Sequence, residues 1–336
     1  MSGATEPVRS GDELDWDALE SHLRAHLDLP AGRPEVRQFT AGRANLTYLV
    51  DVDGFRIVVR RPPRGALAPG AHDIAREYKV LSRLWAVYPP APRALHFCAD
   101  ASVIGAPFIV IEHRAGEIVR DHIPPSMTHH PEVGRRLSLA LIDTMTTLHA
   151  VDVDDAGLND LGRPQGYAER QVSGWLDRWR RAAPDDGPAA MEVVAIELAE
   201  SLPAPQRVSI VHNDLKLDNC QFQADDPDTV SSVFDWDMAT LGDPLFDLAN
   251  LLVATQGSAV QTASPEEVIA RYAEQSGADL SGLAWYEAFA RWRSAVVVQQ
   301  LYNRHVRGDS SDDRLAALGA LVPAIAADAR RALDDR

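Results

Sequence analysis

The sequence predicts an α+β fold with two lobes, a small β-rich N-terminal lobe (residues 1–113) and a larger α-rich C-terminal lobe (residues 114–336). Segments rich in β-branched and aromatic residues are concentrated between positions 36 and 113, which is typical of strands. After position 114, apolar residues recur with helical spacing. The chain of 336 residues is also longer than one small hydrophobic core requires, so two lobes are expected.

The smaller lobe is expected to contain an N-terminal helix, an antiparallel sheet and one main helix. Asp53 and Gly54 separate two apolar segments and form a hairpin turn signal. Pro62 and Pro63 end the second strand, because proline has no N–H to donate to a neighbouring strand. In chain order, the predicted elements are a helix at 12–27, strands within 36–65 that include 45–52 and 55–60, a helix at 71–85 after the third strand, and strands at 94–100 and 106–113.

The larger lobe is expected to be mainly helical, with short strands carrying its polar clusters. Leu137, Leu141, Met145 and Leu148 form one apolar stripe at helical spacing. The predicted elements are helices at 132–150, 166–182 and 190–201, short strands at 208–211, 219–223 and 230–235, and mainly helix after Asp243.

Composition limits the function. The net charge of −16 makes nucleic acid an unexpected partner, since binding to a phosphate backbone needs a basic face. It also argues against an anionic membrane surface, and no apolar stretch of about 18 residues predicts a membrane span. With two cysteines far apart and no apolar leader at the N-terminus, we expect a cytoplasmic protein without a disulfide framework.

The segment IVHNDLKLDNCQF (210–222) has the residues needed for phosphoryl transfer. This reaction needs a carboxylate near the attacking hydroxyl, oxygen ligands for Mg²⁺ and positive charge at the transferred phosphate. Asp214 is the predicted base, and Lys216 is predicted to reach the γ-phosphate of ATP. Asn219 supplies a neutral oxygen ligand.

The second cluster, VFDWDMATLGDPLFDLA (233–249), provides the ionic metal ligand. Asp235 ends an apolar strand, and one Asp with one Asn suffices for Mg²⁺, which also binds phosphate oxygens and water. His212 is expected to anchor its loop through hydrogen bonds. Asp237 is read as a solvated strand end rather than a second metal contact. Asp243 and Asp247 are expected to be structural, near a helix start.

These clusters resemble the aminoglycoside-phosphotransferase-like kinases, relatives of the protein kinases. The family's catalytic loop reads H-G-D-x-x-x-x-N, and residues 212–219 read HNDLKLDN, with Asn213 in place of the usual glycine. Its metal segment reads I-D-W-E/D followed by G-D-P-x-x-D-L-A, and residues 234–249 read FDWDMATLGDPLFDLA. The segments FTAGRANLTYLV, VVRRPPRG, AHDIAREYKVLSRL and IGAPFIVIEHRAGEIV are most similar to phosphotransferase domains associated with acyl-CoA dehydrogenases.

The resemblance, which extends from about residue 36 to 256, implies a bilobal protein-kinase-like fold with ATP between the lobes. It places Arg60 at the position of the lysine that contacts the nucleotide phosphates, although Arg61 remains an alternative, and it pairs Arg60 with Glu77. The remaining nucleotide contacts that it implies are Arg43 and Asn45 in the phosphate-covering hairpin, and the backbone near Glu112 and Arg114.

The acceptor is the least determined part of the prediction. The expected helix at 283–307 has four arginines and a single acid, Glu287, and in this fold such a helix commonly borders the acceptor site. The arginines are Arg291, Arg293, Arg304 and Arg307. Since arginine binds phosphate well, we expect an anionic acceptor, a hydroxyacyl-CoA or a related hydroxy acid. The alternatives are an antibiotic phosphotransferase for aminoglycosides or macrolides, and a catalytically silent kinase-like binding module.

A protein substrate is not expected. Only a short segment separates Asp235 from Gly242. Protein kinases place a long activation and peptide-docking segment after the corresponding aspartate.

Overall fold

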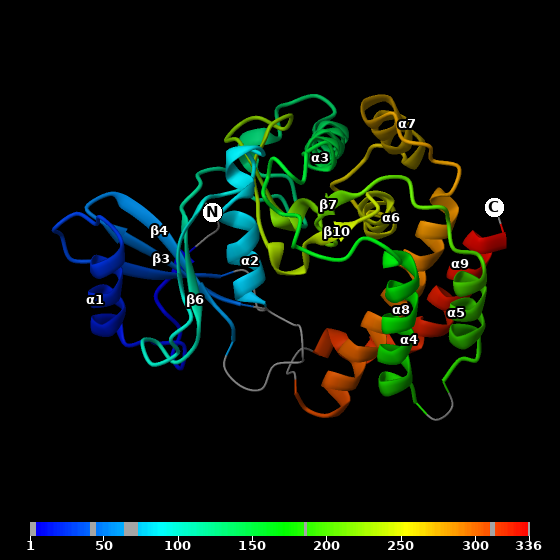
Figure 1. The fold of residues 1–336 in the computed structure, drawn as a ribbon, viewed down its shortest axis with the longest axis horizontal. Helices are drawn as coiled ribbons and strands as arrows, with labels where there is room; N and C mark the ends of the chain where they lie inside the picture. The colour runs from blue at the N-terminus through cyan, green and yellow to red at the C-terminus, as the bar shows by residue number, and fades with distance from the viewer. Residues whose placement is uncertain (1–4, 41–44, 64–72, 185–186, 310–312, 335–336) are drawn as a thin grey trace.

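A six-stranded antiparallel sheet forms the N-terminal part of the fold (Figure 1). The computed structural model describes residues 5–40, 45–63, 73–184, 187–309 and 313–334. In the sheet the strand order is β1-β2-β3-β4-β6-β5. The strands are β1 (Thr5–Glu6), β2 (Glu35–Phe39), β3 (Leu46–Val52), β4 (Phe55–Arg61), β5 (Ala94–Cys98) and β6 (Phe108–Glu112). The predicted hairpin is confirmed, because β3 pairs with β4 and both Asp53 and Gly54 have positive φ.

Two helices cover opposite faces of this sheet (Figure 1). Helix α1 (Trp16–His26) packs Leu19 and Leu23 on the face that includes Ile57 and Val59. Helix α2 (Ile74–Leu81) packs on the other face, in the same core as Val58. Both helices begin later than predicted, since the side chains of Asp15 and Asp73 accept hydrogen bonds from backbone N–H groups and cap their first turns; α2 also ends at Leu81 instead of residue 85.

The alternation of β4 separates its two terminal arginines. Successive side chains of a strand point to opposite faces, so Arg60 shares a face with Val58 and Arg61 shares one with Val59. Arg61 donates to the carbonyl oxygens of Ile104 and Pro62 at 2.7 and 3.1 Å. Arg60 faces α2, and the next subsection describes its partners.

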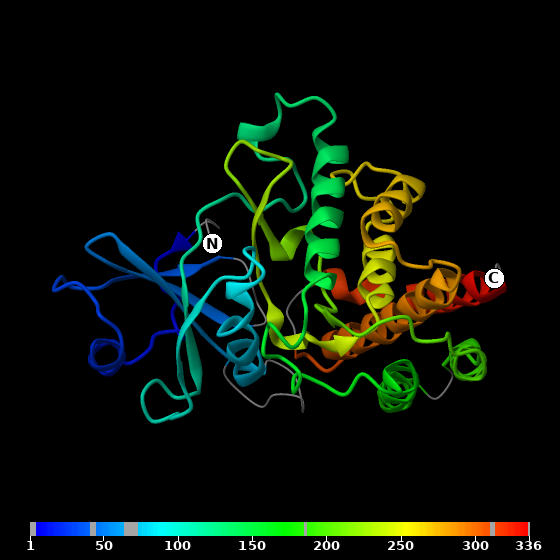
Figure 2. The same ribbon diagram turned by 45° about the horizontal axis from the view of Figure 1, so that its top comes forward.

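The C-terminal part is helical (Figure 2). Helices α8 and α9 run side by side there, and Phe246 of α6 packs edge-on against Trp285, Tyr286 and Phe289 of α8. The α-helices are α3 (Val133–His149), α4 (Tyr167–Ala182), α5 (Ala190–Glu200), α6 (Leu245–Ala254), α7 (Pro265–Ser276), α8 (Leu283–Val306) and α9 (Val322–Asp334). Short 3-10 helices are η1 (Leu84–Ala86), η2 (Pro125–Met127), η3 (Leu217–Asn219), η4 (Trp236–Met238) and η5 (Asp313–Leu321).

Two small antiparallel pairs of strands carry the polar clusters. Strand β7 (Ser209–Val211) pairs with β10 (Thr240–Gly242), and β8 (Cys220–Phe222) pairs with β9 (Val230–Val233). The three strands predicted in this region are present, whereas β1 and β10 were not predicted, because their segments lack the run of β-branched apolar residues that marks β7. The α+β fold is confirmed.

Within the described ranges, every helix is too short or too polar to cross a bilayer.

Candidate active site

The loop at residues 212–219 is fixed by a buried carboxylate. Asp247, in the first turn of α6, accepts hydrogen bonds from the backbone N–H groups of His212 at 2.7 Å and Asn213 at 2.6 Å. The His149 Nε2 atom lies 3.2 Å from the same carboxylate. Burial tends to raise the pKa of Asp247, but the interactions with His149 and His212 outweigh it and hold that pKa below its usual value. The ionised carboxylate therefore holds the start of the loop.

The structural roles predicted around this loop are confirmed. His212 is fully buried, and its Nε2 atom hydrogen-bonds the carbonyl of Phe234 at 2.9 Å. Asp243 accepts hydrogen bonds from the Leu245 backbone N–H at 3.0 Å and from the Tyr286 hydroxyl at 2.9 Å. His212 and Asp247 therefore fix the loop, whereas Asp243 holds the start of α6 against α8.

Asn213 has a backbone conformation that explains the family preference for glycine at this position. Its φ is +66°, in the left-handed region, which asparagine tolerates better than most residues. The Nδ2 group donates to the Met238 carbonyl at 3.0 Å, and Oδ1 accepts from the Tyr167 hydroxyl at 3.2 Å. These bonds stabilise the strained conformation, so this departure from the family pattern does not prevent the loop from forming.

Three of the predicted side chains converge within the loop. The Lys216 Nζ atom lies 3.0 and 2.9 Å from the two carboxylate oxygens of Asp214. The Asn219 Nδ2 group donates to the Asp214 carbonyl at 2.8 Å and to its Oδ2 atom at 2.9 Å. Because Asn219 donates through nitrogen here, its Oδ1 atom is the one able to ligate a metal.

Asp235 lies opposite this loop and pairs with the sheet lobe. It follows β9 in a left-handed conformation, with φ of +68°, which is uncommon outside glycine and often marks functional sites. The Arg60 guanidinium bridges Asp235 and Glu77, at 3.0 Å from the Glu77 carboxylate. Burial raises the pKa of Glu77, while Arg60 opposes that rise. The structure thus brings Arg60, rather than Arg61, to this site together with Glu77.

Asp237 was assigned to a solvated strand end, and this is wrong. The residue is half-buried, and burial together with the charge of Asp235 raises its pKa to about 6. Repulsion from Asp235 and Asp214 contributes to that rise. Hard carboxylate oxygens gathered in this way fit Mg²⁺, whose charge would relieve the repulsion. Their spacing of two residues was visible in the sequence and was the signal for Asp237.

Three of the remaining predicted nucleotide residues, Asn45, Glu112 and Arg114, lie at or next to the ends of sheet strands. Glu112 ends β6 and accepts hydrogen bonds from the Arg93 backbone N–H at 2.8 Å and from Arg114 Nε at 2.6 Å. These bonds brace the connection that follows the sheet. Asn45 is buried next to the start of β3. Arg43 lies outside the described residues.

A family profile described as "Phosphotransferase enzyme family" matches residues 35–289. The chain belongs to this family. Acyl-CoA dehydrogenase family member 11 of Gallus gallus is 34% identical over 348 residues, covering 96% of this chain and 44% of that protein. Family member 10 of Mus musculus is 31% identical over 339 residues, covering 96% of this chain and 31% of that protein. The chain spans less than half the length of these curated relatives.

Solved structures confirm the bilobal, kinase-like fold of this phosphotransferase. A putative aminoglycoside phosphotransferase from Ralstonia eutropha has a TM-score of 0.81 at 27% identity, covering 96% of this chain and 99% of that chain. Macrolide 2'-phosphotransferase type I has a TM-score of 0.63 at 21% identity, covering 94% and 98% respectively, and supports the fold alone. The predicted activity class, a phosphotransferase with an alcohol group as acceptor, is also confirmed.

In this phosphotransferase, only one of the four arginines highlighted on α8 reaches the 212–219 loop. Arg293 Nη2 lies 3.5 Å from the Asn213 carbonyl oxygen. Arg291 instead pairs with Glu287 at 2.9 Å. Arg304 and Arg307 are exposed in and after the last turn of α8, and Arg304 lies about 16 Å along the helix axis from Arg293. Of these four arginines, Arg293 is therefore the one placed to face an acceptor at the loop.

Helix α4 adds two residues near Arg293 that sequence reasoning missed. The guanidinium carbons of Arg178 and Arg293 lie 4.3 and 5.6 Å from the centre of the Trp175 ring. Burial lowers the pKa of both arginines, and in Arg293 the charge of Asp214 opposes this effect. Trp175 and Arg178 are three residues apart on one helix, but only the packing of α4 against α8 brings them to Arg293.

Proposed function

We propose that this protein is an ATP- and Mg²⁺-dependent kinase that phosphorylates a hydroxyl group of an anionic small molecule, a hydroxyacyl-CoA or a related hydroxy acid. The observation that carries the acceptor class is Arg293, which approaches the backbone of the 212–219 loop and interacts electrostatically with Asp214. The protein is acidic overall, and yet the cationic side chain of Arg293 lies near Asp214, the residue that would accept the hydroxyl proton.

The second guanidinium strengthens this argument. Arg178 and Arg293 share the Trp175 ring, whose face attracts cations. Burial disfavours the charge of Arg293, so an anion bound to this guanidinium would offset that cost. A carboxylate or phosphate binds arginine through paired hydrogen bonds, whereas a polycationic aminoglycoside would be repelled.

The nucleotide follows from the other side of the site. Structures of aminoglycoside phosphotransferase APH(4)-Ia mutants were solved as ternary complexes with hygromycin B and either AMP-PNP or ADP. For this chain we assign the nucleotide to the space bordered by Arg60, Glu77 and the connection near Glu112. Arg60 would contact its phosphates, with Glu77 fixing the orientation of the guanidinium.

In this proposal, each polar residue of the 212–219 loop and of the turn after β9 has a defined role in phosphoryl transfer. Asp214 accepts the hydroxyl proton, Lys216 keeps that carboxylate oriented and can reach the γ-phosphate, and Asn219 and Asp235 would hold Mg²⁺ with Asp237 beside them. Mg²⁺ would supply charge neutralisation at the phosphate oxygens. The carboxylate oxygens of the site and the amide oxygen of Asn219 are the ligands that this cation prefers.

A coupled assay of ATP consumption would test the proposal, with hydroxyacyl-CoAs, free hydroxy acids, aminoglycosides, macrolides and amino alcohols as acceptors. We expect turnover with a hydroxyacyl-CoA or hydroxy acid. Turnover with an antibiotic and with no anionic acceptor would restore the antibiotic phosphotransferase. Metal-dependent nucleotide binding without turnover on any acceptor would favour the silent binding module.

Arg293→Gln provides the matched test of the acceptor site. A hydrogen bond to a charged group contributes about 1.5–3 kcal/mol, so the KM for the anionic acceptor should rise roughly 10- to 100-fold while the KM for ATP changes little. Arg304→Gln removes the same charge from an exposed position of α8 and should leave both constants unchanged. An equal, small effect of the two substitutions would remove Arg293 from the acceptor site.

A further inference from the structure

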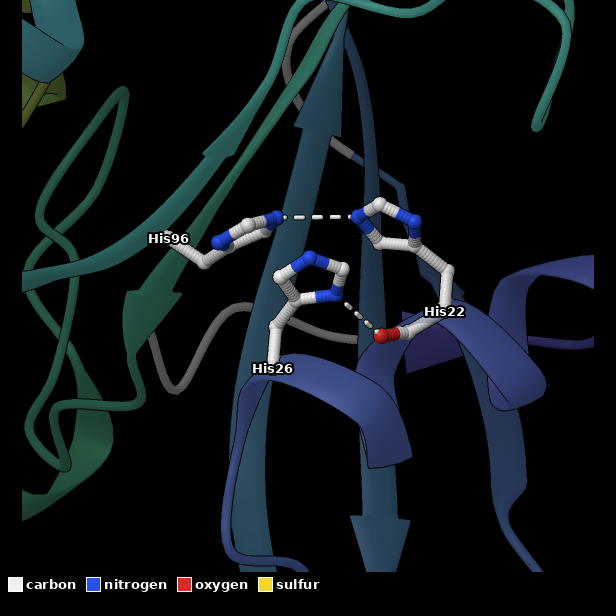
Figure 3. Close-up of side chains that lie close together, drawn as sticks. All are labelled: His22, His26 and His96. Atoms are coloured by element: carbon white, nitrogen blue, oxygen red, sulfur yellow. Dashed lines mark hydrogen bonds between the residues drawn. The ribbon is translucent and has the colours of Figure 1, made fainter.

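Three histidines gather on the sheet lobe, away from the residues of the active site. His22 and His26 come from α1, and His96 comes from the edge strand β5 (Figure 3). One ligand nitrogen from each ring lies within 4.8 Å of the others. His22 and His26 are four residues apart and therefore share a helix face, and His96 shares its sheet face with Cys98, which packs in the core under α1.

The hydrogen bonds leave two ring nitrogens with a lone pair on the same side of the cluster: one Nε2 atom of the His22–His96 pair, and the Nε2 atom of His26. The Nε2 atoms of His22 and His96 are 2.9 Å apart, so two neutral rings must share one proton between these nitrogens (Figure 3). His26 Nδ1 lies 2.8 Å from the carbonyl oxygen of His22. A carbonyl only accepts, so Nδ1 carries the hydrogen and the His26 Nε2 atom keeps a lone pair. Donation from the second ring nitrogen to a backbone carbonyl is typical of histidines that ligate metals.

We propose that His22, His26 and His96 bind a divalent transition-metal cation, such as Zn²⁺, that joins α1 to the edge of the sheet. Tetrahedral Zn–N bonds of 2.0–2.1 Å place two nitrogens about 3.4 Å apart. The His22–His96 pair would open by about half an ångström from its present 2.9 Å, and the ring that carries the shared hydrogen would change tautomer, with that hydrogen moving to its Nδ1 atom, so that both Nε2 lone pairs could face the metal.

The ligand set selects the class of metal. Three imidazoles suit zinc, copper, nickel or cobalt, whereas Mg²⁺ and Ca²⁺ require oxygen ligands. The His22 ring also packs edge-on against Phe108, 5.5 Å between centroids, which limits its movement.

A second group in the described chain, His129, His130 and Asp225, is a weaker candidate. The His130 Nε2 atom already contacts both the carbonyl and the carboxylate of Asp225, at 3.0 and 3.1 Å. The Arg136 guanidinium lies 3.4 Å from its other ring nitrogen. A fixed positive charge at that distance opposes the binding of a cation, whereas Asp100 adds negative potential at His22.

Metal binding to the full-length, chelator-treated protein tests this site. We expect ZnCl₂ to bind by calorimetry and to raise the Tm, and CoCl₂ to give the visible absorption of a nitrogen-ligated cobalt site. His26→Ala and His96→Gln should each weaken Zn²⁺ affinity by at least about tenfold, and both should abolish the cobalt spectrum. His122→Ala, an exposed histidine outside both groups, is the control and should retain both properties.

The substitutions also separate this site from the acidic cluster of the active site. His26 is exposed, so His26→Ala should keep the circular dichroism spectrum and the metal-free Tm of the parent protein. If Zn²⁺ affinity and the cobalt spectrum are unchanged in both histidine variants, the three histidines do not form a metal site.

Discussion

Asp247→Asn should separate the stability of the 212–219 loop from its chemistry. The carboxylate accepts hydrogen bonds from two backbone N–H groups through different oxygens, and its side chain is fully buried. Asparagine keeps the volume but has one acceptor oxygen, so its Nδ2 group must face one of these donors. The replacement loses a charge-assisted bond and leaves a buried donor unpaired.

Both losses can be given a magnitude. A hydrogen bond to a charged group contributes about 1.5–3 kcal/mol, and an unsatisfied buried donor costs about 1–3 kcal/mol. Because asparagine retains part of the network, we expect Asp247→Asn to reduce the free energy of unfolding by about 2–4 kcal/mol. The kcat should fall as well, since His212 and Asn213 set the position of Asp214.

Urea unfolding gives the stability difference, and steady-state kinetics give kcat and the KM for ATP. Asp177→Asn removes an exposed carboxylate from α4 and is the control, with an expected change below about 0.5 kcal/mol. If Asp247→Asn matched the parent protein in both stability and kcat, the proposed anchoring role would be refuted.

The effect also has a defined pH dependence. The pKa of Asp247 is lower in the folded protein than in the unfolded chain, so its carboxylate contributes stability above the unfolded value. That contribution is lost as pH falls through the lower, folded pKa. The stability difference between parent and Asp247→Asn should therefore be constant near neutrality and shrink below about pH 4. A difference that grows on acidification would contradict this sign.

Three further predictions concern single side chains. Asp214→Asn should lower kcat by roughly 10²- to 10⁴-fold while calorimetry shows nearly unchanged ATP binding, and near-parental turnover would exclude Asp214 as the base. Asp235→Ala removes the ionic metal ligand and should abolish the Mg²⁺ dependence of nucleotide binding, so an unchanged metal requirement would exclude Asp235. Cys98 and Cys220 are buried, and burial raises the pKa of Cys220, so a thiol reagent should label neither in the native protein and both in guanidinium chloride. Rapid labelling of the native protein would contradict their burial.

Local patterns predicted most of the fold because they depend on neighbouring residues. Helix α3 differs from its predicted range by one residue at each end, and α8 begins as predicted and ends one residue earlier, since their apolar residues recur over several turns. Asp53–Gly54 encodes its turn through backbone preference alone. By contrast, β10 was not predicted, because its threonine, leucine and glycine lack the β-branched apolar run that marks its partner β7.

The candidate site was only partly predictable for the same reason. The spacing of Asp214, Lys216 and Asn219 places them on one short loop. The pKa of Asp237 depends on how deeply its side chain is buried and on the charge of Arg60, which comes from a strand far away in sequence. Arg293 approaches Asn213 only because α8 packs beside α4 and α6. Such contacts follow from the tertiary fold, and a single sequence does not specify them.

Arg60 connects three parts of the chain, β4, α2 and the turn after β9, through Glu77 and Asp235. Asp235 therefore already has a cationic partner before any ligand arrives. If Mg²⁺ takes this carboxylate, binding is an exchange of counterions, in which the arginine is released to the incoming phosphates. Without ligand, the Arg60–Asp235 ion pair then holds the two lobes together. The affinity for the nucleotide reflects the difference in free energy between two ion pairs, and not the full free energy of forming a new one.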